Sequence, residues 1–301
     1  MGLPRTEEAS DRYRDLDTWP SARILDAIVD AQRAAIEAVR PAIPALAEAA
    51  EAAATRIRAG GRLVYAGAGS PALMAQSDAL ELPGTYGLSP ETVPVLAAGG
   101  PAAMIAIPSG AEDDGAAAEA GIDALAVGPA DTVLALSASG TTPFALAALR
   151  RAKTLGALTI GMASNAGTPL LVDADIAVLL ATPPEVIAGS TRMNAGTAQK
   201  CALNMLSTLI GIRLGHVHDN LMVNVRVENE KLRRRAIGII MRVTGVDEAV
   251  AQDALTRSDG SVKVAILIAA GARDAHDAHD LLARQGGAVR AGLSALTTRN
   301  G

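Results

Sequence analysis

The sequence predicts an α/β fold, with a parallel sheet flanked by helices and a small helical bundle at the C-terminal end. Short aliphatic runs typical of buried strands alternate with helical patterns between residues 62 and 180, as in a parallel sheet covered on both faces. Loops rich in Gly, Ser and Thr follow two of these runs, at the edge where open α/β sheets bind ligands. Beyond residue 245, short helical patterns separated by Gly replace the strand signals.

Two helices and an arm precede the first strand. Residues 1–18 are charged and show no periodicity, so we interpret them as an extended arm outside the packed core. Apolar residues then recur every three or four positions over 21–40, which predicts an amphipathic helix. A second helix is predicted over about 44–58, and Gly60 and Gly61 end it.

The elements of the predicted sheet come next. Strands are predicted at 62–66, 131–136, 157–163 and 176–180, with a further candidate at 92–96 and a helix from Pro143 to about Leu155. A long apolar helix is predicted over Gly189–Leu214, and another begins near Asn229. The segment 245–301 predicts three or four helices of roughly ten residues each.

Composition limits the classes of function. Half of the 301 residues are hydrophobic but only 2% are aromatic, which predicts an aliphatic core with many small side chains. The net charge of −5 argues against a nucleic-acid partner, and one Cys excludes an internal disulfide or a Cys-rich zinc site. No apolar run reaches the ~18 residues that span a bilayer, and the polar N-terminus shows no signal peptide. We therefore expect a soluble, cytoplasmic protein without a membrane partner.

The loop that follows the strand at 131–136 predicts an anion site. It contains Ser137, Ser139, Gly140, Thr141 and Thr142, directly before a helix. Hydroxyl donors, free backbone N–H groups and the helix dipole can together hold a phosphate. The alternative is ordinary helix capping by a single threonine, which needs only one hydroxyl. Four hydroxyls favour a ligand site.

The loop after the first strand carries Gly67 and Gly69 and superficially fits a dinucleotide fingerprint. That fingerprint requires an acidic residue about 20 positions later, at the end of the second strand. The sequence has Ala97, Ala98, Gly99 and Gly100 there. A nicotinamide cofactor is therefore disfavoured, and a tight turn without a ligand stays open as an alternative.

Two acidic segments are candidates for acid–base chemistry. Asp78 and Glu81 follow the glycine loop, and Glu81 lies between Leu80 and Leu82, where partial burial would raise the pKa of its carboxyl toward that of a general acid. From spacing alone, a surface carboxylate remains the simpler interpretation. The run Glu112–Asp114 is equally compatible with a solvated helix start.

No metal site is predicted. His276 and His279 could share one helix face but lack a third ligand at suitable spacing, so we favour an exposed polar helix. His216 and His218 follow the long apolar helix and are interpreted as cap or loop residues. Cys201 lies inside an apolar helix and is most simply a core residue.

An ordered set of motifs extends over nearly the whole chain. Residues 184–200 read PEVIAGSTRMNAGTAQK, acidic motifs occupy Asp78–Gly87 and Gly110–Asp114, and further motifs occupy Asn204–Thr208, Asn220–Val223 and Asn229–Leu232. Together they resemble the N-acetylmuramic acid 6-phosphate etherases, a family related to the glucokinase regulatory protein and built on the sugar isomerase fold. The resemblance implies a phosphosugar domain with N-terminal helices over 1–244 and a ubiquitin-associated-like bundle over 245–301.

The resemblance also implies an activity. In that family two glutamates serve the active site, and the matching positions are Glu81 and Glu112. The expected lyase cleaves the D-lactyl ether of N-acetylmuramic acid 6-phosphate and gives N-acetylglucosamine 6-phosphate and D-lactate. The ring opens, a base removes the C2 proton, an acid protonates the departing lactate oxygen, and water adds at C3. Two carboxyl groups suffice, so neither metal nor organic cofactor is expected. A homodimer is expected for two reasons. The family is dimeric, and the N-terminal helices and the long apolar helix have more apolar surface than one sheet can cover.

The amino-sugar phosphate is expected to contact three segments of the chain. The candidate binding residues are Gly67, Gly69, Ser70, Ser137, Ser139, Gly140, Thr141, Thr142, Glu185, Ser190, Thr191, Arg192 and Lys200.

The chain departs from the family at three positions. Leu73 and Thr141 stand where the family usually has Arg, and Asn194 stands where it usually has Lys. A charge-assisted hydrogen bond contributes ~1.5–3 kcal/mol, so either Arg192, Lys200 and the hydroxyl loop compensate or the ligand differs. Three alternatives therefore stand beside the etherase: an etherase for an unphosphorylated muramyl sugar, a non-catalytic sugar-phosphate-binding regulator, and an isomerase of the same fold.

Overall fold

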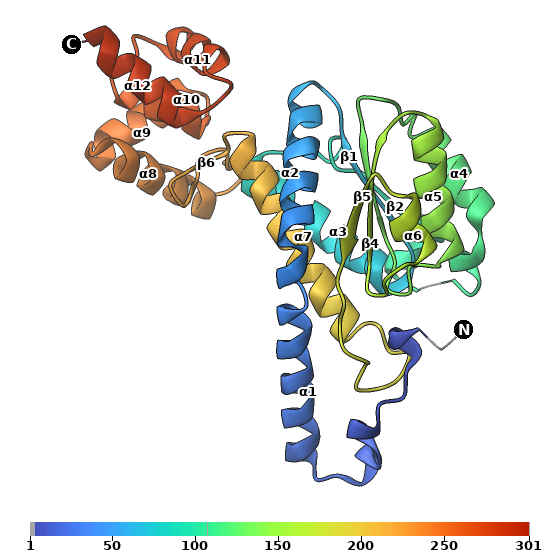
Figure 1. The fold of residues 1–301 in the computed structure, drawn as a ribbon. Coiled ribbons are helices and arrows are strands. Elements are labelled where there is room, and N and C mark those ends of the chain that lie inside the picture. Colours follow the sequence, from blue (N-terminus) through green and yellow to red (C-terminus); the bar gives the residue numbers. More distant parts are fainter. Residues whose placement is uncertain (1–3, 107, 301) are drawn as a thin grey trace. The chain divides into compact units, whose positions relative to one another are not determined.

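The structure is a computed structural model that describes residues 4–106 and 108–300 (Figure 1). The described residues of 1–80 and 90–207 form one compact unit, and those of 81–89 and 208–301 form a second. The predicted boundary after Thr244 falls inside the second unit, because α8 (Glu230–Thr244) packs against α9 (Glu248–Arg257) and α10 (Val262–Ala269).

The N-terminal arm is folded rather than extended. It forms 3₁₀ turns at Arg5–Glu7, Asp11–Tyr13 and Leu16–Thr18. Thr6 is buried, and the Arg5 N–H donates to Asn165 Oδ1 at 2.9 Å. The prediction of an arm outside the packed core is therefore wrong for the first turn.

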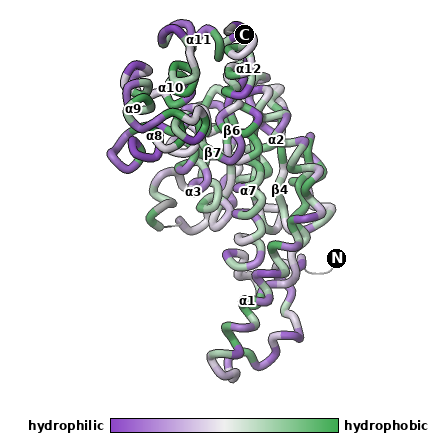
Figure 2. Tube along the Cα trace, turned by 90° about the vertical axis from the view of Figure 1, so that its left-hand side faces the viewer, coloured by the Kyte–Doolittle hydropathy of each residue, from purple (hydrophilic) through white to green (hydrophobic). Residues whose placement is uncertain are grey.

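Two helices follow the arm, as predicted. They are α1 (Ser21–Glu37) and α2 (Ile43–Arg58), joined by a 3₁₀ turn at Arg40–Ala42. Along α1, hydrophobic residues are interleaved with hydrophilic ones (Figure 2). The buried face of α2 consists of Leu46 and four alanines, which allow close packing of the kind predicted from the composition.

The core of the first unit is a five-stranded parallel sheet in the order β2-β1-β3-β4-β5, which confirms the predicted fold class. The strands are β1 (Leu63–Gly67), β2 (Val95–Ala97), β3 (Thr132–Leu136), β4 (Leu158–Ala163) and β5 (Ile176–Leu179). All residues of β1 and β3 are buried, as expected for central parallel strands. The edge strand β2 is shorter than predicted because Pro94 has no N–H to donate.

Helices cover both faces of this sheet (Figure 1). On one face lie α4 (Gly115–Ala124), α5 (Pro143–Thr154) and α6 (Pro169–Asp173). On the other lie α2 and the unit's own parts of α3 (Gly69–Tyr86) and α7 (Asn194–Arg213). Helix α7 begins five residues later than the sequence predicts, because residues 189–193 form a loop that starts at Gly189 with φ +76°.

A buried carboxylate links β1, α3 and α7. Asp78 is 2% exposed and accepts hydrogen bonds from Tyr65 Oη at 2.8 Å and Ser207 Oγ at 3.0 Å. Burial and the neighbouring Asp78 carboxylate raise the pKa of Tyr65 well above its usual value. Asp78 therefore joins secondary-structure elements, and we assign it a structural rather than an acid–base role.

The second unit is mainly a helical bundle. After α8, α9 and α10 come α11 (Ala275–Arg284) and α12 (Val289–Asn300), so that four helices follow residue 245, within the predicted three or four. The sequence did not predict the short antiparallel pair β6 (Val217–His218) and β7 (Leu221–Met222). No helix among the described residues is long and apolar enough to cross a membrane.

A hydrogen bond between buried Lys263 and half-buried His216 ties the residue that precedes β6 to the bundle. Lys263 Nζ lies 2.9 Å from His216 Nδ1 and donates to Gly287 O at 2.9 Å. Burial lowers the pKa of Lys263 to about 8. Burial and the adjacent ammonium lower the pKa of His216 to about 3, so the neutral imidazole accepts the hydrogen bond. His216 is therefore a half-buried loop residue between α7 and β6, as the predicted cap or loop allows, and it is the partner of Lys263.

We expect acid to destabilise the second unit through His216. In the unfolded chain His216 binds a proton near pH 6.5, whereas the folded chain binds it only near pH 3. Between these values the unfolded state holds more protons, so the free energy of unfolding falls as the pH falls, by at most about 1.4 kcal/mol per pH unit.

Urea unfolding followed by circular dichroism at pH 7 and pH 5 tests this expectation. The free energy of unfolding of His216→Gln should change by up to about 2 kcal/mol less than that of the wild type between these pH values. His279→Gln, at an exposed histidine of α11, is the matched control and should behave as the wild type. Identical pH dependence in wild type and His216→Gln would contradict the expectation.

Candidate active site

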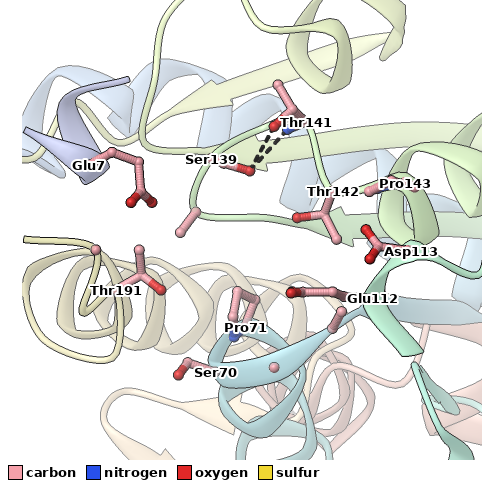
Figure 3. Close-up of a pocket in the computed structure, with 14 residues that line it drawn as sticks. Glu7, Ser70, Pro71, Glu112, Asp113, Ser139, Thr141, Thr142, Pro143 and Thr191 are labelled. Carbon is pink, nitrogen blue, oxygen red and sulfur yellow. Dashed lines mark hydrogen bonds between the residues drawn. The ribbon is translucent and has the colours of Figure 1, made fainter. Parts of the chain in front are cut away.

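A cavity of about 380 Å³ lies at the carboxyl end of the sheet (Figure 3). Its walls are the loops that follow β1 and β3, the 3₁₀ turn Ala111–Asp113, the loop at Gly189 and Thr191, and Glu7 of the arm. All of these segments belong to the first unit. The cavity thus occupies the edge where the sequence predicted a ligand.

The hydroxyl-rich loop after β3 forms one wall of the cavity. Ser137 Oγ shares hydrogen bonds with Thr142 Oγ1 at 2.8 Å and Ser139 Oγ at 3.2 Å, and it accepts the Gly140 N–H at 2.9 Å. Ser139 Oγ in turn accepts from Thr141 N and from Thr141 Oγ1. Thr142 occupies the N-cap position of α5, but its Oγ1 is engaged with Ser137 and makes no side-chain cap, so the alternative of ordinary hydroxyl capping does not hold for Thr142.

Position 140 requires glycine. Gly140 has φ +76°, and a Cβ there would lie 2.2 Å from Thr168 Oγ1. The loop is therefore packed tightly onto Thr168, which holds the Ser139 and Thr141 hydroxyls at the cavity wall while Gly140 itself remains buried.

Asn165 fixes this wall from behind, and sequence reasoning missed it. Its buried side-chain amide donates to Ala138 O and Ser139 O, both at 3.2 Å, and also to Thr6 Oγ1 at 3.2 Å. Its carbonyl oxygen accepts the Arg5 N–H. The available signal was a polar Ser-Asn pair directly after the strand now seen as β4.

Three carboxylates face the cavity: Glu112, Asp113 and, from the opposite side, Glu7 (Figure 3). The adjacent Asp114 instead caps α4 by accepting the Ala117 N–H at 2.9 Å, so part of this acidic run is a helix start. No Lys or Arg lines the cavity among the described residues. A ligand phosphate would therefore rely on neutral donors.

The other predicted binding residues divide into two groups. Gly69, Ser70, Ser139, Thr141, Thr142 and Thr191 line the cavity with Glu112. Gly67, Ser137, Gly140, Glu185, Ser190, Arg192 and Lys200 do not, although Ser137 and Gly140 support its wall. Arg192 is exposed and Lys200 half-buried.

Glu81 belongs to the second unit, whereas every residue that lines the cavity belongs to the first. Its apolar neighbours predicted partial burial, but the Glu81 side chain is exposed, as is Leu80, whereas Leu82 is buried.

Glu185 and Asn194 stabilise the start of α7. The Glu185 carboxylate is 1% exposed and accepts the N–H groups of Asn194 at 2.7 Å and Ala195 at 3.0 Å. Burial raises the pKa of Glu185. The buried Asn194 side chain donates to Pro184 O at 2.9 Å and accepts from Gln32 Nε2 at 3.1 Å. These contacts are those of a helix cap and a neutral link between α1 and α7.

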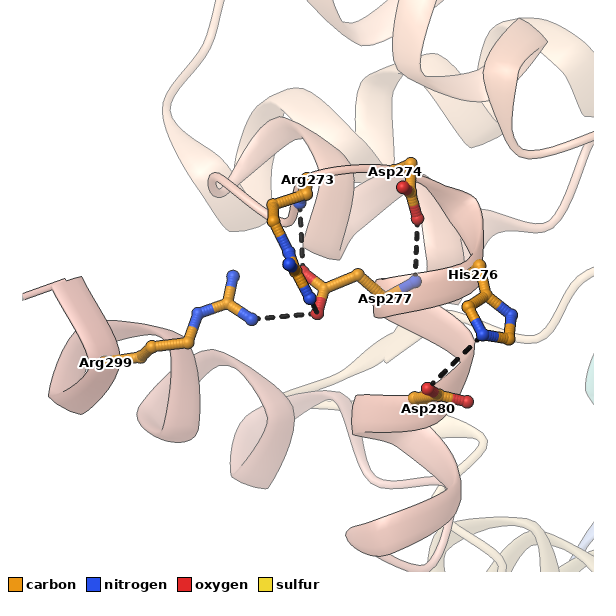
Figure 4. Close-up of polar contacts among 6 residues, drawn as sticks. All are labelled: Arg273, Asp274, His276, Asp277, Asp280 and Arg299. Atoms are coloured by element: carbon orange, nitrogen blue, oxygen red, sulfur yellow. Dashed lines mark hydrogen bonds and ion pairs between the residues drawn. The ribbon is translucent and has the colours of Figure 1, made fainter.

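A second polar cluster, on α11 and α12, is structural (Figure 4). The buried Asp277 carboxylate accepts from Arg299 Nη1 at 2.9 Å and from the Arg273 N–H at 3.0 Å, which holds its pKa well below the usual range. His276 and His279 are exposed on α11, which confirms the predicted polar helix. Among the described residues, no group of three or more His, Cys, Asp or Glu side chains could hold a metal ion.

Comparison with known families supports the fold of the first unit and matches a separate family model to part of the second unit. A SIS domain matches residues 22–164, and the C-terminal lid domain of glucokinase regulatory protein matches residues 219–265. Among solved structures, a putative phosphosugar isomerase involved in capsule formation from Bacteroides fragilis aligns with a TM-score of 0.51 at 22% identity, over 65% of this chain and 94% of that one. This likeness shows the sugar isomerase fold.

Curated relatives match over nearly the full length. The N-acetylmuramic acid 6-phosphate etherase of Deinococcus radiodurans is 45% identical over 95% of this chain and 94% of that protein. The protein of the same name from Mycolicibacterium smegmatis is 39% identical over 96% of this chain and 97% of that protein. The protein of that name from Streptomyces coelicolor is 48% identical over 80% of this chain and 77% of its own. At these identities and coverages, the chain belongs to the N-acetylmuramic acid 6-phosphate etherase family.

Proposed function

We propose that the protein is a carbon–oxygen lyase that cleaves the D-lactyl ether of N-acetylmuramic acid 6-phosphate to N-acetylglucosamine 6-phosphate and D-lactate. One observation carries the proposal: Glu112 shares a cavity with a hydroxyl-rich loop that leads into α5. That cavity combines a carboxylate for proton transfer with donors for an anion. The activity named for the relatives supports the same reaction.

The phosphate is assigned to the start of α5. Ser139, Thr141 and Thr142 supply hydroxyls there, and the helix N-terminus favours negative charge. Since no Lys or Arg among the described residues lines the cavity, neutral donors of about 0.5–1.5 kcal/mol each take the place of charged ones. Binding should therefore be modest and only weakly dependent on salt.

The proposed chemistry is an elimination followed by addition of water. After ring opening, Glu112 removes the C2 proton, and Glu81 protonates the departing lactate oxygen. Water then adds across the C2–C3 double bond: Glu81 takes a proton from the water as its oxygen joins C3, and Glu112 returns its proton to C2, so both carboxyl groups regain their starting states. Two carboxyl groups in opposite protonation states can carry these proton transfers, so the scheme uses neither metal nor organic cofactor.

We also propose that the protein works as a homodimer. Leu25, Val29 and Ile36 of α1 are 63%, 49% and 47% exposed, and helical spacing places them on one face. An apolar stripe of this kind on a helix that extends beyond its own sheet (Figure 1) is typical of an interaction surface. A second copy of the chain is the expected partner.

The cellular setting follows from the reaction. We propose that the protein acts in the cytoplasm, in the breakdown of N-acetylmuramate released during peptidoglycan recycling. The substrate named for its relatives supports this setting.

Replacing the proposed base should abolish turnover. With N-acetylmuramic acid 6-phosphate as substrate, we expect release of D-lactate by the wild type and a drop in kcat of about a hundredfold or more for Glu112→Gln. Glu119→Gln, at an exposed glutamate of α4 outside the cavity, is the matched control. No lactate from folded wild-type protein, or full activity of Glu112→Gln, would refute the assignment.

The hydroxyl loop should discriminate phosphorylated from unphosphorylated sugar. By calorimetry, N-acetylglucosamine 6-phosphate should bind more tightly than N-acetylglucosamine. Ser139→Ala should weaken binding of the phosphosugar about two- to tenfold, the value of one neutral hydrogen bond. Ser294→Ala on α12 is the control. Equal affinity for the two sugars would mean that the loop contacts sugar hydroxyls rather than phosphate.

Light scattering tests the dimer. At micromolar concentration the mass should be twice the 30.5 kDa of the chain. Val29→Glu should shift the protein toward the monomer because it places a charge on the apolar stripe of α1. Val172→Glu, at a 71% exposed valine of α6, should leave the mass unchanged. A monomer mass for the wild type would refute the proposal.

A further inference from the structure

Among the described residues of the arm, Glu7 is the one that lines the cavity, and neither the motifs nor the proposed reaction gives it a role. Figure 3 shows its carboxylate directed into the cavity, across from Glu112 and beside Thr191. Among the described residues, no hydrogen bond or ion pair engages this carboxylate. The group is therefore available to a ligand.

The backbone on both sides of Glu7 is fixed. The Arg5 N–H donates to Asn165 Oδ1 at 2.9 Å, and the Gly189 N–H donates to Thr6 O at 3.0 Å. Thr6 is 2% exposed and also accepts from the Asn165 amide. These contacts hold the turn Arg5–Glu7 on the first unit, so Glu7 enters the cavity from a defined anchor and not from a loose terminus.

The neighbouring loop at Gly189 leaves space for the Glu7 carboxylate. A Cβ at Gly189 would lie 3.0 Å from Glu7 Oε2, and Gly189 has φ +76°, a conformation that favours glycine. A side chain at position 189 would crowd the carboxylate. The glycine and the anchored turn thus act together to set where the carboxylate lies.

The chemistry of a carboxylate defines what it can recognise. An ionised glutamate accepts hydrogen bonds and donates none. It attracts sugar hydroxyls and amide N–H groups and repels phosphate. Within the same cavity, the hydroxyl donors and the start of α5 favour the anionic end of the ligand. Glu112 and Asp113 also lie near the start of α5, so the two sides differ in their donors. The hydroxyl loop and the start of α5 offer donors to the phosphate, whereas the Glu7 carboxylate offers only acceptors.

We propose that Glu7 is a specificity-determining residue that accepts a hydrogen bond from a hydroxyl or amide N–H of the sugar and directs the phosphate toward α5. The proposal rests on the proposed function in one respect, that the ligand is an amino-sugar phosphate. Asn165 acts as a positioning residue, because it anchors the turn that carries Glu7.

Calorimetry with N-acetylglucosamine 6-phosphate tests the proposal without requiring turnover. Loss of a charge-assisted hydrogen bond in Glu7→Ala should weaken binding about tenfold to a hundredfold. Glu7→Gln keeps an oxygen acceptor and should lose less. Glu8→Ala removes the adjacent carboxylate, which does not line the cavity, and is the matched control with wild-type affinity expected. Unchanged thermal unfolding of Glu7→Ala and Glu7→Gln would show that the fold is intact.

The lactate assay gives a second readout. A binding residue should raise KM and change kcat little, in contrast to the loss of kcat expected for Glu112→Gln. Wild-type affinity in Glu7→Ala would overturn the proposal, as would equal losses in Glu7→Ala and Glu8→Ala. If the wild type binds the phosphosugar but releases no lactate, the proposed reaction fails while the binding comparison still decides the role of Glu7.

Discussion

The geometry of the cavity depends on a single buried carboxamide. Asn165 has four side-chain hydrogen bonds, two to the N-terminal arm and two to the loop after β3, so it joins both walls to the end of β4. One amide can do this because its carbonyl accepts once and its two N–H groups serve three acceptors, one N–H being shared between two of them. Without it, the Ser139 carbonyl would lose the Asn165 donor and the Arg5 N–H would lose its acceptor, whereas Ala138 O would keep the Ser164 N–H. Asn165 does not line the cavity, yet it anchors the two segments that bring Glu7 and the Ser139 hydroxyl to the cavity wall.

The sequence predicts those parts of the fold that local pattern determines. The aliphatic runs that became β1 and β3, and Pro143 at the start of α5, carry their signal within a few residues. The role of Thr142 could not be predicted in this way. Its hydroxyl is hydrogen-bonded to Ser137 and not to the start of α5, and this contact depends on the conformation of the whole loop. The position of Glu7 in the cavity could not be predicted from local sequence either, because Asn165, which anchors its turn through Arg5, lies about half a chain away.

The departures from the family pattern remove positive charge that could balance the carboxylates of the cavity. Thr141 lines the cavity where the family usually has Arg, and Asn194 lies in a buried network with Pro184 and Gln32. A buried ammonium at position 194 would need a charged partner or would cost several kcal/mol, whereas the amide is satisfied as it stands. The three cavity carboxylates are therefore not balanced by cations from these positions, and neutral donors set how strongly an anion can be held.

Chemical labelling of Lys263 can measure local opening of the second unit. With a pKa of about 8, about half of this amine is neutral and nucleophilic at pH 8, compared with well under one per cent of an ordinary lysine. At 7% exposure, however, acylating reagents cannot reach Nζ in the closed bundle. Labelling therefore requires the segment at β6 to separate from α10. Because opening exposes the amine, its pKa then returns toward that of an ordinary lysine, and the labelling rate measures how often the bundle opens locally.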